Sequence, residues 1–156
     1  MKINKVIILI NLILQTIISA CKISTPWHEM KSSNLNLEKE VVVGLTYIEL
    51  GDDSDKNKIF WKSTFELKKK LKDYPGYVGG SIRKEIFGNK GWTMTVWEDE
   101  ESLEKFVYGE RLQTAIEEGS PALLKTKFSR LKVKRKEIPL PWDEVEKILK
   151  DSNIQK

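Results

Sequence analysis

The sequence is poor in the side chains that most often build catalytic and metal sites. Its 156 residues include one cysteine, Cys21, and one histidine, His28. A single thiol has no disulfide partner within the chain. A metal site needs several convergent ligands, and a lone histidine supplies only one. The chain has no Ser–His–Asp set, glycine-rich phosphate loop or Cys-x-x-Cys motif. We therefore predict no metal site, and the catalytic residues remain unknown at this stage.

The charge balance argues against a nucleic-acid partner. The formal net charge is +4, and it falls to +2 when Lys2 and Lys5 at the start of the chain are left out. Phosphate binding needs many clustered cations. The run Lys125–Lys136 is basic, but it also fits a strand with one solvated face. Hydrophobic residues make up 40% and charged residues 32% of the chain, which is typical of one globular domain with an appendage.

The first 20 residues are built like a signal peptide. Lys2 and Lys5 precede the apolar stretch Val6–Ile18, and the small residues Ser19 and Ala20 come directly before Cys21. The apolar stretch is shorter than the roughly 20 residues of a spanning helix. This arrangement resembles the lipobox of bacterial lipoproteins. The resemblance implies a diacylglyceryl thioether on Cys21, cleavage before it, and an N-terminus acylated by palmitate-type chains.

We predict a lipid-anchored protein of the bacterial cell envelope, with its domain outside the cytoplasm. Residues 21–39 are expected to be a flexible tether, because turn formers such as Thr25-Pro26 and Ser32-Ser33-Asn34 interrupt any periodicity. Two alternatives stay open: the leader is retained as an anchor, or Cys21 follows an ordinary secretory signal by coincidence.

Residues 40–150 predict an α+β domain, followed by a tail at 151–156. The order is β-α-β-β-α-β plus a C-terminal helix, the ferredoxin-like arrangement with an antiparallel sheet. The predicted strands are 41–48, 77–87, 92–97 and 128–137; the predicted helices begin at Ser54 or Asp55, within Glu98–Ser102, and after Pro141.

Alternation places Val78, Ile82 and Ile86 on one face of their strand. Gly79-Gly80 fits a bulge or a close backbone approach. Helices are expected on one face of the sheet only. Neither face of the strand 92–97 is plainly polar, so we predict a homodimer in which a second sheet covers the other face.

Several segments resemble the antibiotic-biosynthesis-monooxygenase-like proteins of the dimeric α/β-barrel superfamily. These segments are Pro75–Tyr77, Thr93–Leu103, Phe106–Val107 and Ile138–Glu144, within a resemblance that covers about 41–150. The resemblance implies a homodimer with a cavity between helices and sheet in each subunit. Characterised relatives insert oxygen into aromatic or polyketide substrates, often without metal or flavin. Some bind haem, and many have no demonstrated activity.

One position departs from that family. Close relatives tend to carry a histidine where this sequence has Leu112, and His28 lies in the predicted tether. A histidine-ligated haem or a histidine base inside the domain is therefore excluded, and no cofactor is predicted.

Five residues are candidates to line a pocket for a hydrophobic small molecule. They are Trp61, Phe65, Arg83, Trp97 and Tyr108. The competing interpretation is that the aromatic residues among them form the core. Tyr47 and Arg83 lie in predicted strands, where they are candidates to orient a polar ligand group. The competing interpretation for Arg83 is a solvated or paired residue on the strand face. Two functions remain: a monooxygenase-type oxidoreductase, or a non-catalytic ligand-binding or structural lipoprotein that keeps the fold.

Overall fold

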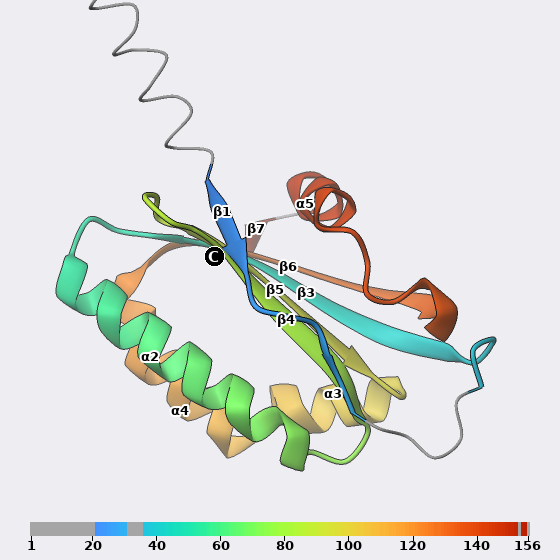
Figure 1. Ribbon diagram of the computed structural model, residues 1–156. Helices are drawn as coiled ribbons and strands as arrows, with labels where there is room; N and C mark the ends of the chain where they lie inside the picture. The colour runs from blue at the N-terminus through green and yellow to red at the C-terminus, as the bar shows by residue number, and fades with distance from the viewer. Residues whose placement is uncertain (1–20, 31–35, 153, 156) are drawn as a thin grey trace, which may run out of the picture.

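A computed structural model describes residues 21–30, 36–152 and 154–155 (Figure 1). The predicted signal peptide at 1–20 and the Ser32-Ser33-Asn34 segment lie outside the described residues. The described chain forms one antiparallel sheet with helices on both faces. None of the helices in this part of the chain is both long and apolar enough to cross a bilayer.

The predicted β-α-β-β-α-β order with a C-terminal helix is confirmed. The sheet has the strand order β1-β4-β5-β3-β6-β7, and β2 also pairs with β4. The strands are β1 (Lys22–Ser24), β2 (His28–Glu29), β3 (Glu40–Leu50), β4 (Tyr77–Glu85), β5 (Lys90–Trp97), β6 (Leu123–Lys134) and β7 (Ile154–Gln155). The α-helices are α2 (Ser54–Lys70), α3 (Glu100–Val107), α4 (Glu110–Gly119) and α5 (Trp142–Asp151).

Aspartates cap the first two of these helices. Asp53 precedes α2 and accepts hydrogen bonds from the backbone N–H groups of Asp55 and Lys56. It therefore holds the cap position one or two residues before those predicted, Ser54 or Asp55. Asp99 accepts a hydrogen bond from the Ser102 N–H at the start of α3. These bonds lower the pKa of both aspartates, because they stabilise the charged carboxylate.

Strand alternation divides the core between two layers. Val41, Val43 and Leu45 on β3 point to the layer that contains α5, where they pack with Met94 and Val96. Val42 and its neighbours on the other face pack under α2 and α3. Figure 1 shows α2, α3 and α4 on one side of the sheet and α5 on the other.

The expectation of helices on one face only is therefore wrong. Val145 and Leu149 of α5 are fully buried in the layer that a second sheet was predicted to cover. The amphipathic segment after Pro141 fills that layer within the chain. Homodimerisation stays a prediction. The uncovered sheet face no longer supports it, because α5 covers that face.

A bulge also changes the predicted face of β4. The β4–β5 register shifts between Tyr77 and Gly79, which leaves Val78 opposite no residue of β5. An extra residue reverses the alternation. Val78 therefore packs in the α5 layer, whereas Ile82 points toward α2 and Ile86 is exposed.

The structure also differs from the expected tether over part of 21–39. β1 pairs with the far end of β4, and β2 pairs with Gly79 and Gly80. Glu29 forms an ion pair with the buried Arg135 at 3.0 Å. The outer edge of β4 offers unpaired backbone groups, and the two short strands on either side of Pro26 pair with it. Residues 22–24 and 28–29 are thus part of the sheet.

Candidate functional site

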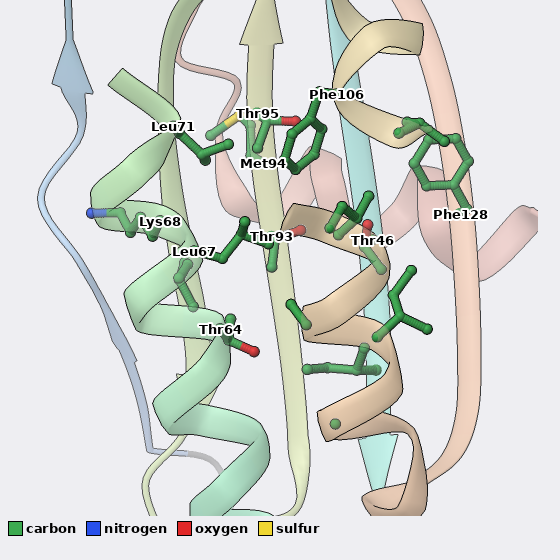
Figure 2. A pocket seen from close by; sticks show the side chains of 18 of the residues that line it. Thr46, Thr64, Leu67, Lys68, Leu71, Thr93, Met94, Thr95, Phe106 and Phe128 are labelled. Atoms are coloured by element: carbon green, nitrogen blue, oxygen red, sulfur yellow. The ribbon is translucent and has the colours of Figure 1, made fainter. Parts of the chain in front are cut away.

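A cavity of about 520 Å³ lies between the sheet and the helices α2 and α4 (Figure 2). Leu67 of α2 and Leu71, which directly follows that helix, form one wall, and Leu112 and Ala115 of α4 form another. Phe128 of β6 closes the side. The hollow lies where the central strands carry threonine and glycine below the helices, at Thr46, Thr93, Thr95 and Gly80.

The floor of the cavity is made of threonines. Thr46 of β3 and Thr93 of β5 are cross-strand partners, and Thr95 lies two residues along β5. Figure 2 shows these three side chains on the strands, facing the helices. Thr95 donates to the Gly44 carbonyl at 3.4 Å. Among the described residues, Thr46 and Thr93 have no side-chain hydrogen bond, so both hydroxyls can serve a ligand.

Tyr77 adds a phenol to the lining. Burial raises its pKa to about 12, so the hydroxyl stays protonated at neutral pH and can donate a hydrogen bond. A Cβ atom on Gly80 would lie 2.7 Å from the Tyr77 Oη and 2.8 Å from the Met94 carbonyl oxygen. Only glycine allows this close approach, which places the Tyr77 hydroxyl over the strand.

An aromatic cluster closes one end of the cavity. Trp97 stacks on Phe106 at 4.9 Å, and Tyr77 meets Trp97 edge-on at 5.3 Å. The Trp97 Nε1 donates to the Thr95 hydroxyl at 3.0 Å. Trp97 is fully buried, so it acts on the cavity through Thr95, whose hydroxyl it orients.

The lining has few ionisable groups. Besides the tyrosines, the described residues of the lining include Lys68 and Arg130 and no carboxylate or imidazole. Burial lowers the pKa of Lys68, and its Nζ points to the outer side of α2 in Figure 2. Arg130 is held by Glu100 at 2.9 Å and Glu104 at 3.5 Å. The cavity therefore suits an uncharged, mainly apolar ligand that carries hydroxyl or carbonyl groups.

The structure brings one of the five candidate pocket residues to this cavity. Tyr108 lies at its mouth and is 79% exposed. Trp97 lies behind the wall, as described above. The core interpretation is thus correct for Trp97.

The other three candidates lie elsewhere. Trp61 and Phe65 pack together along α2 at 5.9 Å, with Lys84 over the Trp61 ring at 4.9 Å. Arg83 lies in the α5 layer, where it pairs with Glu146 at 3.5 Å. Tyr47 lies in that same layer and donates to Glu49 at 2.9 Å. These residues do not meet at one site.

Sequence reasoning missed the threonine floor. The signal was the repeated threonine at every second position, Thr93 and Thr95 on β5 and Thr46 on β3. Alternation shows that these threonines share a face of the sheet, but it does not show whether helices cover that face. The same pattern also fits a face exposed to solvent.

The lining does not fit a histidine-ligated haem. His28 lies on β2, against β4 at the edge of the sheet, and does not line the cavity. Across residues 21–30, 36–152 and 154–155, no three His, Cys, Asp or Glu side chains gather in a group that could hold a metal ion.

The fold is that of the antibiotic-biosynthesis-monooxygenase-like, ferredoxin-fold proteins. A proposed monooxygenase from Fusobacterium nucleatum superposes with a TM-score of 0.60 at 13% identity, over 71% of this chain and 49% of that one. This chain thus spans about half the length of that protein. A single-residue mutant of SnoaB, a cofactor-independent oxygenase from Streptomyces nogalater, superposes with a TM-score of 0.51 at 14% identity, over 65% of this chain and 98% of that one.

A third structure gives the same result. A proposed antibiotic biosynthesis monooxygenase from Nitrosomonas europaea has a TM-score of 0.52 at 11% identity, over 64% of this chain and 94% of that one. No model of a known protein family matches the chain, and neither does any curated protein. At these identities the comparisons establish the fold alone.

Proposed function

We propose that this chain is a bacterial lipoprotein, anchored in a membrane through Cys21, whose domain binds a hydrophobic small molecule outside the cytoplasm. The observation that carries the binding function is the cavity of about 520 Å³ under α2 and α4. Its size falls within the range of small-molecule sites, which are mostly apolar with a few placed polar groups.

The lining supports a particular ligand class. Leu67, Leu71 and Phe128 provide apolar walls, and the hydroxyls of Thr46 and Thr93 lie on the floor. Hydroxyl groups both donate and accept hydrogen bonds. We infer an uncharged, partly aromatic or otherwise flat apolar ligand that carries carbonyl or hydroxyl oxygens.

The anchor is supported by the sequence around Cys21. This residue follows a positively charged start, an apolar stretch and two small residues, and it is the only thiol of the chain. Several acyl chains on one cysteine would give durable binding, since each buried CH₂ contributes about 0.8 kcal/mol. Mass spectrometry of the N-terminal peptide tests this part; an unmodified Cys21 peptide contradicts it.

A cofactor-independent oxygenase is the second candidate. It is favoured by the fold shared with SnoaB, which is described as such an oxygenase. General-base catalysis by this lining is poorly supported, because its described residues include no carboxylate or imidazole and the Lys68 amine points outward. A non-catalytic binding role therefore fits the geometry better.

Blocking the cavity tests the binding function. Ala115 of α4 lines the cavity, whereas the neighbouring Thr114 is exposed. We expect Ala115→Trp to fill the space and to raise the Kd for apolar aromatic probes at least tenfold. Thr114→Trp adds the same side chain to the same helix and should leave Kd unchanged.

Two measurements complete this test. Small molecules that co-purify with the full chain are identified by mass spectrometry, and they should be absent from Ala115→Trp. Oxygen uptake with hydroxylated aromatic compounds separates the two candidate functions. Equal probe binding by both tryptophan variants contradicts the proposed site, and turnover with oxygen favours the oxygenase.

A further inference from the structure

A second hollow, of about 580 Å³, lies on the opposite face of the sheet beside α5. Six lysines and two glutamates line it, together with Tyr47, Trp92 and Leu149. We call it the basic groove. Its lysines are Lys22, Lys90, Lys125, Lys127, Lys147 and Lys150, and its glutamates are Glu85 and Glu146.

The basic groove carries an excess of positive charge. Glu146 is already engaged, with the Lys22 Nζ at 2.6 Å and the Arg83 guanidinium at 3.5 Å. Glu49 lies between Lys90 and Lys125 across the strands. Within the described part of the chain, no carboxylate lies within 4.0 Å of the amines of the other lysines that line the groove: Lys90, Lys125, Lys127, Lys147 and Lys150. Such a surface attracts anions.

Exposed apolar side chains adjoin the basic groove. Phe87 is 72% exposed and Ile86 is 49% exposed, and both lie in the turn between the groove residues Glu85 and Lys90. Ile23 of β1, which is 56% exposed, lies at the same end of the sheet but on its α2 face, because its partner Lys84 covers the Trp61 ring. We call these three residues the apolar turn. Apolar groups gathered beside a basic surface are typical of proteins that lie in a membrane interface.

Cys21 is fixed at the same end of the molecule. The Ile86 N–H donates to the Cys21 carbonyl at 2.9 Å, and Lys22 pairs with Glu85 in the sheet. Figure 1 shows β1 beginning beside the turn that joins β4 and β5. A lipid on Cys21 would therefore enter a bilayer directly beside the apolar turn and the basic groove, with no flexible residues between.

We propose that this end of the domain docks on an anionic phospholipid bilayer. The apolar turn enters the interfacial region, and the lysines of the basic groove contact the phosphate headgroups. This inference rests on the proposed anchoring at Cys21. It adds an orientation, because α2 and α4, with the cavity, then lie away from α5 on the other face of the sheet.

The test places a fluorescent label at residue 87 of the full chain. Phe87→Cys is produced in a bacterium, purified from membranes and labelled with bimane; lipid blocks the Cys21 thiol, and peptide mass spectrometry locates the label. The protein is reconstituted into vesicles of phosphatidylcholine alone, or mixed equally with phosphatidylglycerol. Flotation reports anchoring, and quenching by spin-labelled lipid reports docking.

We expect flotation with both kinds of vesicle, and several-fold stronger quenching in the anionic ones. Ile116→Cys on α4 is the matched control, because Ile116 is also an exposed apolar residue, and its label should stay unquenched. Lys125→Gln with Lys127→Gln should lower quenching at residue 87 in anionic vesicles to the level in neutral ones.

The failures are distinguishable. A chain that floats but shows equal quenching at residues 87 and 116 overturns docking and leaves the anchor intact. Quenching at residue 87 that is the same in both kinds of vesicle overturns the role of the lysines. A chain that does not float overturns the anchor and the docking together.

Discussion

At the scale of single residues, hydroxyl groups decide what the cavity can recognise. Tyr77 is the most informative of them, because its phenol has a raised pKa in the folded chain. Burial disfavours the phenolate. At neutral pH the protonated phenol can donate a hydrogen bond to a ligand. At alkaline pH its deprotonation lowers the stability of the folded chain.

Tyr77→Phe should flatten the alkaline loss of stability. The Tyr77 pKa is about 12 in the folded chain and about 10 in an unfolded chain. Between these values the unfolded chain loses this proton and the folded chain keeps it, so rising pH favours unfolding. The contribution of Tyr77 is complete below about pH 10 and is lost as the pH rises through about 12.

Urea unfolding across this pH range measures the effect. We expect the free energy of unfolding to fall less steeply with pH in Tyr77→Phe than in the parent. Tyr108→Phe removes an exposed phenol and should keep the parental slope. Coincident slopes for the parent and Tyr77→Phe would show that the Tyr77 phenol is solvated in the folded state.

At the scale of elements, the segment 22–29 is held to β4 by side chains as well as backbone. The Ile82 N–H donates to the Thr25 hydroxyl at 3.0 Å, and the Thr25 N–H donates to the Ile82 carbonyl at 2.8 Å. The Ser81 hydroxyl donates to the Thr25 carbonyl at 2.7 Å. The segment thus turns a free edge of the sheet into a paired one.

Thr25→Ala should loosen this edge. Loss of one hydrogen bond costs about 1 kcal/mol, which corresponds to about fivefold faster amide exchange at Ile82. Hydrogen exchange of the peptide that covers 80–86 measures this rate. Ser24→Ala, at an exposed position of β1, is the matched control. Fast exchange of 80–86 in the parent chain would mean that the segment is the flexible tether expected from the sequence.

The element order was predictable from the sequence, because alternation and helical spacing are local patterns. The five-residue pocket was not, since it depends on which strand face each helix covers. Trp61 and Phe65 share α2 with the cavity residues Thr64 and Leu67, yet they lie outside the cavity. The pairing of 22–29 was missed for a related reason: an edge strand takes its register from its partner rather than from its own composition.

At the scale of the whole molecule, α5 decides which surface is available to a second copy. Val145 and Leu149 cover Val43, Leu45 and Val96, all of them fully buried. A homodimer that stacks two sheets face to face would require α5 to leave this position. The outer edge of β6 beyond Lys127 pairs with no described strand, but Arg130, Lys132 and Lys134 along it discourage edge pairing.

Removing α5 should therefore create the apolar surface that self-association needs. A chain that ends at Leu140 exposes the β3 and β5 residues of the α5 layer, and contiguous apolar patches drive association. Light scattering gives the mass of the particle, and dividing it by the mass of one subunit gives the number of subunits. We expect this number to be at least twice as large for the chain that ends at Leu140 as for a control chain that ends at Ser152. Circular dichroism confirms that the sheet persists in both. Equal values for the two chains would mean that α5 does not shield this face, and that the argument for covering it within one chain is wrong.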